Sequence, residues 1–243
     1  MEKCLVCLQN SLNHIRYPNT VHPLFLDCEI IVCKDCGFAF VGKSFSQKEL
    51  TQYYESEYGK IAGRDSYMSP KDYFFNPMKM YKASRSLSQI NLLKKYIDLA
   101  RVKSVLEIGP GLGTMAYFMS RYNKEMNIVV VEYEKKAIEH MNYLGIDVFS
   151  SIEDIQDNSI EVLISSHSLE HYQNFELIDV VQTYKNKLSE NGILLLEVPL
   201  VDFNRELNLS KEHEPHTLFF TMNSVKILFE RFGFNVSFID TVG

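Results

Sequence analysis

The chain has 243 residues, of which 46% are hydrophobic and 23% are charged, and its formal net charge at pH 7 is −6. This composition is that of a globular protein with room for one main core and a small second module. No apolar run is long enough to span a bilayer, and the N-terminus lacks the basic flank and apolar stretch of a signal peptide, so we expect a cytoplasmic protein without a membrane span. The absence of a basic stripe disfavours nucleic acid as a partner.

Two cysteine pairs stand near the start of the chain. Cys4 and Cys7 form one C-x₂-C pair, and Cys33 and Cys36 form another after 25 intervening residues. A reducing compartment disfavours disulfides, and four thiolates in two such pairs are typical of a tetrahedral structural zinc site. We therefore predict bound zinc that supplies folding energy to a small zinc ribbon.

Other residues around these pairs leave some alternatives open. His14 and His22 could each replace a cysteine as a metal ligand, whereas Cys28 lies outside both pairs and is interpreted as a small buried residue. Apolar runs at 24–26 and 30–32 predict the two short strands of the ribbon.

Three segments are expected along the chain: a zinc ribbon over 1–42, a helical connector or lid over 43–75, and a main domain over 76–243. In the connector, Ser46 and Glu49 have the spacing of a capping box, which predicts a helix start. Asn76 and Pro77 predict a second helix start. The face of that helix would carry Leu87, Ile90, Leu93 and Ile97.

From residue 102 onward, strand and helix patterns alternate. Alternation of this kind predicts the α/β class, with a mostly parallel Rossmann-like sheet covered by helices on both faces. The expected strands are 105–108, 128–131, 148–149, 160–165, 193–198 and 234–240, and the expected helices are 114–121, 135–143, 175–188 and 224–232, with a turn at Asn191-Gly192.

A glycine-rich turn follows the first of these strands. Gly109, Gly111 and Gly113 alternate with other residues, and Glu107 stands two residues before the first of them. A dinucleotide fingerprint would need its third glycine at position 114, which is Thr, and the G-K-[ST] of a P-loop is absent. An acid at the strand end suits a cationic ligand group better than a phosphate.

This stretch resembles motif I of the class I S-adenosylmethionine (SAM)-dependent methyltransferases, in which the acid faces the ammonium end of the ligand. The segment from Ser166 to His171 is similar to the S-H-x-L-E-H segment of many small-molecule methyltransferases. The resemblance covers about residues 102 to 240 and implies SAM as cofactor. It also implies that Ser166 and His167 flank the methionine part and the acceptor.

Two further strand ends supply candidate cofactor contacts. Glu132, followed by Tyr133, ends the second strand, where a carboxylate can accept two hydrogen bonds from ribose hydroxyls. The resembling family brackets adenine with the turn after the third strand, which here contains Ser151 and Ile152. Ser151 stands where that family commonly has Asp, and its hydroxyl can still bond the adenine edge.

Histidines supply the candidate catalytic groups. Members of the resembling subgroup carry Glu-His, then aromatics and Ser/Thr, in the loop after the fifth strand. Here that loop offers His216 as the favoured pocket residue and His213 as the second choice. Because histidine titrates near neutrality, His171 or His216 is expected to act as general base. Tyr172 or Glu214 would orient it.

A zinc ribbon joined to a methyltransferase resembles a bacterial group that modifies deoxysugar nucleotides, natural-product sugars or polysaccharide precursors. The expected partner is therefore a small acceptor, in particular a nucleotide-linked sugar. Two alternatives remain: an RNA methyltransferase that holds RNA with its ribbon, and a non-catalytic binding protein with the same fold. The seventh strand usual in the family is missing, so either the sheet closes differently, or a partner supplies an edge, or the chain is truncated. An uncovered edge predicts a homo-oligomer.

Overall fold

The computed structural model describes residues 3–17, 23–26, 28–53, 81–204 and 216–241. The chain divides into two compact units. The first comprises Met1–Leu50, His167–Lys185 and Val198–Gly243, and the second comprises Thr51–Ser166 and Asn186–Glu197. Within the described ranges, no helix is long and apolar enough to cross a membrane.

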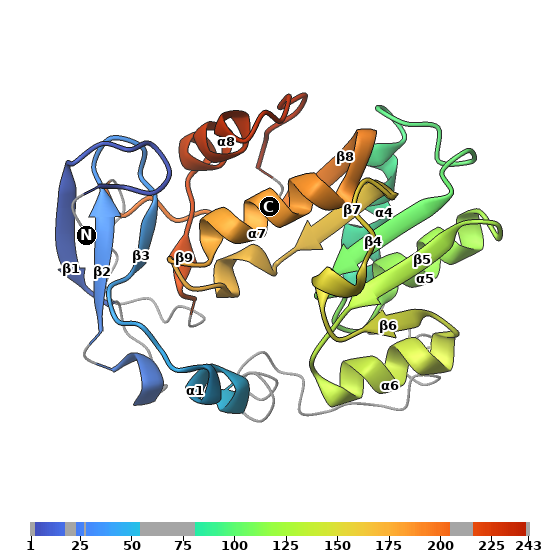
Figure 1. Cartoon of the computed structure of the whole chain (residues 1–243), viewed down its shortest axis with the longest axis horizontal. Coiled ribbons are helices and arrows are strands. Elements are labelled where there is room, and N and C mark those ends of the chain that lie inside the picture. The colour runs from blue at the N-terminus through green and yellow to red at the C-terminus, as the bar shows by residue number, and fades with distance from the viewer. Residues whose placement is uncertain (1–2, 18–22, 27, 54–80, 205–215, 242–243) are drawn as a thin grey trace. The chain divides into compact units, whose positions relative to one another are not determined.

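The second unit contains a five-stranded parallel sheet in the order β6-β5-β4-β7-β8 (Figure 1). Its central strand is the one that precedes the glycine turn, as the Rossmann-like fold class predicts. The strands are β4 (Ser104–Ile108), β5 (Asn127–Val131), β6 (Asp147–Phe149), β7 (Ile160–Ser166) and β8 (Leu188–Glu197).

Alternate residues of these strands pack on three helices, α4 (Tyr81–Leu93), α5 (Thr114–Tyr122) and α6 (Lys135–Leu144). The period of two along each strand directs every second side chain to this face. Full burial of a Val, Leu or Ile side chain stabilises a fold by about 1.5–3 kcal/mol, so this core anchors the strand ends. Its members include Val105, Ile128, Val130, Val162, Ile164, Leu93, Met115, Met119 and Met141.

The first unit contains a four-stranded antiparallel sheet in the order β1-β2-β3-β9. The first three strands, β1 (Leu12–Arg16), β2 (Glu29–Cys33) and β3 (Ala39–Val41), come from the segment that carries the cysteine pairs. The fourth, β9 (Leu218–Phe219), comes from near the other end of the sequence. The expected ribbon is therefore completed by a distant segment.

Helices with clear end signals flank these sheets. The capping box expected at α1 (Gln47–Gln52) is present, since the Ser46 amide donates to Glu49 Oε2 at 2.8 Å and the Glu49 amide donates to Ser46 Oγ at 3.3 Å. A second capping box starts α8 (Met222–Arg231). The remaining elements are α7 (Leu177–Lys187) and the short 3₁₀ helices η1 (Pro23–Phe25), η4 (Ile152–Asp154) and η5 (Leu169–His171).

Three expected elements differ in the structure. Residues 24–26 do not form a strand: the segment turns as η1, because Pro23 lacks an amide for a ladder and the Leu26 amide donates to its carbonyl. Residues 234–240 form no strand, since their side chains are exposed or only half-buried. The turn expected at 191–192 lies inside β8, in an irregular stretch where the register shifts from Ile160↔Leu188 to Val162↔Ile193.

Two further expectations concern α4 and the domains. Ile90 and Leu93 are buried as expected, whereas Leu87 is 44% exposed, so that assignment to the apolar face was wrong. The helix start at Asn76-Pro77 lies outside the described residues. The boundaries at 42 and 75 stay predictions.

Candidate active site

The carboxyl ends of the parallel strands form one edge of the sheet. Register pairs connect Ile108 with both Val131 and Ser165, Val131 with Phe149, and Ser166 with Glu197. The residues that directly follow these strands therefore lie along this edge, where open α/β sheets bind their ligands.

The glycine turn between β4 and α5 has a backbone that other residues rarely adopt. Gly109, Gly111 and Gly113 have φ angles of 63°, 56° and 69°, all in the left-handed region. A Cβ on Gly113 would also overlap the side chain of Met141 on α6. Both features keep this turn free of side chains, as close approach of a ligand to the backbone requires.

Glu107 belongs to the strand that precedes this turn, and the residue is only 5% exposed. Its Oε2 accepts a hydrogen bond from the Ala116 amide, in the first turn of α5, at 3.0 Å. Burial raises the pKa of Glu107 to about 8, and the Ala116 hydrogen bond only partly opposes this shift. A cationic group placed beside Glu107 would favour the charged form.

The Glu132 carboxylate joins the end of β5 to the glycine turn. Its Oε2 accepts from the Gly111 amide at 3.2 Å, and its Oε1 accepts from the amides of Tyr133 and Glu134 at 2.7 and 3.0 Å. Burial raises the pKa of this group too. Three amides thus fix its orientation, and a carboxylate has room for about four such bonds. The Tyr133 side chain is exposed.

The turn after β6 presents Ser151 and Ile152. Ser151 precedes η4, and its Oγ accepts from the Glu153 amide at 3.2 Å, which leaves the hydroxyl hydrogen able to donate elsewhere. Both side chains are partly exposed. A donor beside an apolar side chain suits the edge and face of a heterocyclic base.

Three polar side chains meet at the end of β7. Ser166 Oγ accepts from Nε2 of Gln89, a buried residue of α4, at 3.0 Å, and the same Nε2 contacts the carboxylate of Glu197 at the end of β8. Ser166 was expected from the sequence, whereas its two partners were not. The strand-end position of Glu197 was a usable signal, whereas Gln89 carried none.

The first unit holds a histidine cluster. Ligand atoms of Glu170, His171 and His216 lie within 4.8 Å of one another, and the two imidazole rings are 5.0 Å apart in an edge arrangement. Glu170 is 1% exposed and His216 is 8% exposed. His167 has a positive φ of 53°, and its Nδ1 lies 3.4 Å from Glu170 Oε1. Both favoured base candidates thus adjoin a buried carboxyl group.

The backbone around His216 is held by two side chains. The Tyr17 hydroxyl donates to the His216 carbonyl at 2.9 Å and accepts from the His216 amide at 3.0 Å. The Thr217 hydroxyl donates to the carbonyls of Glu170 and Tyr172 at 2.9 and 2.6 Å. Tyr17 was not expected from the sequence, and Glu170 was expected only as part of the segment from Ser166 to His171, without a role of its own.

Not every expected residue can be placed. His213 and Glu214, expected near the base, lie outside the described residues. Tyr172, the other expected orienting residue, contributes its carbonyl to Thr217. Glu170 is an acidic neighbour of both imidazole rings in the described part of the chain.

The four paired cysteines come together as a candidate metal centre. Sγ of Cys4 lies 3.7 Å from Sγ of Cys36, and Sγ of Cys7 lies 3.5 Å from Sγ of Cys33. Tetrahedral zinc–thiolate bonds place sulfurs about 3.8 Å apart, so the set fits zinc. The hydrogen bond between Cys4 and Cys36 lowers the pKa of Cys4 to about 5 and raises that of Cys36.

Of the two alternative metal ligands, His14 is described, and it is not part of the cysteine cluster. His14 Nδ1 lies 3.3 Å from a carboxylate oxygen of Glu29 on the neighbouring strand. Cys28 is buried, as expected, and its Sγ lies 3.7 Å from the carbonyl of Leu24. His22 is outside the described residues.

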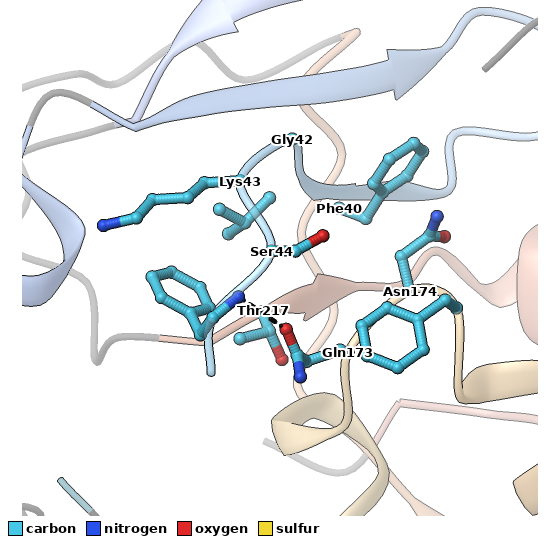
Figure 2. A pocket seen from close by; sticks show the side chains of 10 residues that line it. Phe40, Gly42, Lys43, Ser44, Gln173, Asn174 and Thr217 are labelled. Carbon is cyan, nitrogen blue, oxygen red and sulfur yellow. Dashed lines mark hydrogen bonds between the residues drawn. The ribbon is translucent and has the colours of Figure 1, made fainter. Parts of the chain in front are cut away.

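Figure 2 shows a small pocket in the first unit, lined by polar and aromatic side chains. Lys43 and Ser44 follow β3, and the Phe45 amide donates to Gln173 Oε1 at 2.7 Å. Its volume of about 90 Å³ suits a few water molecules rather than a nucleoside. Nothing in the sequence pattern indicated it.

Two solved structures match most of this fold. The DhpI protein in complex with SAH is 15% identical, with 77% of this chain and 88% of that chain covered and a TM-score of 0.52. The PH0226 protein of Pyrococcus horikoshii OT3 is 16% identical, with 72% and 89% covered and a TM-score of 0.52. At such identities the likeness concerns the fold alone.

The chain spans 50 to 58% of the length of three other solved structures that it matches. No curated protein sequence matches it. A family model described as a methyltransferase domain matches residues 81–237, which is more than half of the chain and includes the glycine turn and both strand-end acids. The chain therefore belongs to the methyltransferase domain family, and its parallel sheet is the Rossmann-like fold of that family.

Proposed function

We propose that this protein is a SAM-dependent methyltransferase that acts on a small acceptor. The observation that carries the proposal is the buried Glu107 carboxyl group, which is bonded to the first turn of the helix that follows three left-handed glycines. A buried acid is costly to ionise, and the ammonium group of a ligand would relieve that cost. A dinucleotide or phosphate ligand would not.

Different residues of the chain bind different parts of SAM. Glu107 faces the ammonium end, and Glu132, oriented by three amides, accepts from the ribose hydroxyls. Ser151 and Ile152 flank the adenine, and Ser166 together with Gln89 and Glu197 adjoins the methionine end. These residues all belong to the second unit, and all of them except Gln89, which lies on α4, lie along one edge of its sheet.

The transfer step asks the protein for alignment and for one proton acceptor. When bound, SAM supplies a methyl group on a sulfonium sulfur. That sulfur keeps the electron pair of the broken bond, so the leaving group is a neutral thioether. The acceptor's nucleophilic atom forms the new bond to carbon, and its proton passes to His171 or His216. The buried Glu170 carboxylate stabilises the imidazolium that results.

The finer assignments rest on the sequence resemblance. A nucleotide-linked sugar is the proposed acceptor, and a structural zinc is proposed at Cys4, Cys7, Cys33 and Cys36. The sulfur separations of 3.5 and 3.7 Å support that zinc assignment. Four thiolates leave zinc no open position, so the metal is structural rather than catalytic.

Calorimetric titration with SAM and its demethylated product tests the cofactor. We expect binding of both, with about a tenfold to hundredfold loss of affinity in Glu107→Gln, because a charge-assisted hydrogen bond is removed. The exposed acid Glu153, changed to Gln, is the matched control and should retain affinity. Heat from neither compound, in a protein shown to be folded, would refute the proposal.

Transfer of labelled methyl from SAM to nucleoside-diphosphate sugars, with RNA tested in parallel, identifies the acceptor class. Once an acceptor is found, His171→Asn combined with His216→Asn should lower kcat by about 10²–10⁴-fold with SAM affinity unchanged. Undiminished turnover in the double variant would exclude both histidines as the base.

A further inference from the structure

We infer that the cysteine metal centre positions His216, so that loss of the metal displaces the proposed base while the cofactor residues keep their structure. The inference rests on the proposed function for the catalytic meaning of His216. The coupling itself rests on contacts within the first unit alone.

The first contact is a shared sheet. Only Thr217 separates His216 from β9, and β9 pairs with β3 through Ala39↔Phe219 and Phe40↔Leu218. The Val41 amide also donates to the Thr217 carbonyl at 2.9 Å. β3 begins three residues after Cys36. The backbone that follows His216 is therefore bonded to the strand that follows the second cysteine pair.

The second contact is made with the cysteine turn itself. The Thr221 hydroxyl donates to the Cys36 carbonyl at 2.7 Å. Gly37, which follows that cysteine with φ 78°, lies so close that a Cβ on it would stand 2.6 Å from Thr221 Cγ2. The Asn204 side-chain amide donates to the Cys33 carbonyl at 3.1 Å. The carbonyls of Cys33 and Cys36 thus bind one residue that precedes His216 and one that follows it in sequence.

The third contact involves the first cysteine pair. Arg231, at the end of α8, donates from Nη1 to the carbonyls of Leu5 and Val6, the two residues between Cys4 and Cys7. Because α8 starts from the Thr221 capping box, this contact holds the far end of the same segment.

The Tyr17 clamp completes the coupling. Tyr17 directly follows β1, its hydroxyl holds both backbone groups of His216, and its ring lies 5.6 Å from the Phe25 ring and 5.9 Å from the Phe219 ring. The position of His216 therefore depends on β1 and β3, the strands on either side of the metal-bearing β2.

Structural zinc sites of this kind contribute folding energy, so metal binding and the order of this sheet are linked. Residues that the sheet holds in place should therefore lose order when the metal is lost. Because the coupling is reciprocal, disorder of these residues should in turn weaken metal binding. Oxidation or chelation of the thiolates would therefore release His216. Glu107, Glu132 and the glycine turn belong to the other unit and make none of these contacts.

Hydrogen exchange of the full chain, zinc-loaded and after chelation, tests the inference. We expect the amides of 216–221 to exchange at least about tenfold faster without zinc, while the affinity for SAM's demethylated product changes less than about twofold. Unchanged exchange at 216–221 would overturn the coupling, and so would joint loss of protection and cofactor affinity. If no cofactor binds in either state, the proposed function fails while the exchange result still decides the coupling.

A matched pair of variants separates the coupling from helix capping. Thr221→Val removes both the cap of α8 and the bond to Cys36. Ser224→Ala removes the other half of the capping box and the bond from Ser224 Oγ to the Thr221 carbonyl, and it leaves the bond to Cys36 in place. We expect zinc affinity to fall about fivefold further in Thr221→Val than in Ser224→Ala, and Thr221→Ser to retain it. Equal zinc affinity in the first two variants would overturn the inference, and this readout needs no acceptor.

Discussion

At the scale of single residues, the Glu107 carboxyl group links ligand binding to pH. Its pKa is raised to about 8 in the free protein, so it is mostly protonated at neutrality and must lose that proton to pair with a cation. We predict that SAM affinity rises with pH, by at most about tenfold per unit, and that the rise stops above pH 8.

Calorimetry in two buffers of different ionisation enthalpy measures the proton released on binding. About one proton should leave per SAM bound near pH 7, and Glu107→Gln should abolish that release. The same release in the variant would assign the proton to another group. The effect of pH on the free energy of unfolding has the opposite direction to its effect on SAM affinity. The folded state holds an extra proton on Glu107 between pH 4.5 and 8, so the free energy of unfolding falls as pH rises through that range.

Residues at strand ends were predictable because their position follows from one local pattern. Glu107 is the last but one residue of its strand, and Glu132 and Ser166 stand where apolar runs stop. Parallel strands bring these points to one edge. Gln89 and Tyr17 were not predictable. Their partners are 77 and 199 positions away in sequence, and no periodicity records such a pairing.

At the scale of elements, the turn before α5 and the end of α6 offer a matched comparison. Gly113 and Gly145 have nearly equal φ angles of 69° and 70°, but only Gly113 has an atom within reach of an added Cβ. We predict that Gly145→Ala lowers the free energy of unfolding by about 1 kcal/mol, the cost of the left-handed backbone. Gly113→Ala should cost about 2–4 kcal/mol, because Met141 must also move.

Urea denaturation measures the change in the free energy of unfolding for both variants. Equal changes would show that the Met141 side chain moves aside at no cost. At this scale the sequence predicted the parallel strands well, because β4, β5 and β7 are rich in Val, Ile and Leu. It failed for β9, a two-residue strand with no pattern of its own. Its pairing with β3 depends on tertiary context alone.

At the scale of the whole molecule, β8 is an outer strand of the parallel sheet. It is ten residues long, and within the described ranges it pairs only with β7. Unpaired backbone groups of this kind promote strand pairing between copies. We therefore predict self-association, which a charge on this strand, as in Leu196→Lys, should weaken. Light scattering of both proteins is the measurement, and a monomeric native chain would contradict the prediction.

The antiparallel sheet has a consequence for synthesis on the ribosome. β3 is complete at Val41, but its neighbour β9 is translated about 180 residues later, which takes roughly 10 to 35 s at ~5–20 residues per second. During that interval the nascent chain exposes an unfinished strand edge to proteases and chaperones. Stalled chains that stop before Leu218 should be cleaved within their first fifty residues even when zinc is supplied, and chains that extend beyond Phe219 should resist.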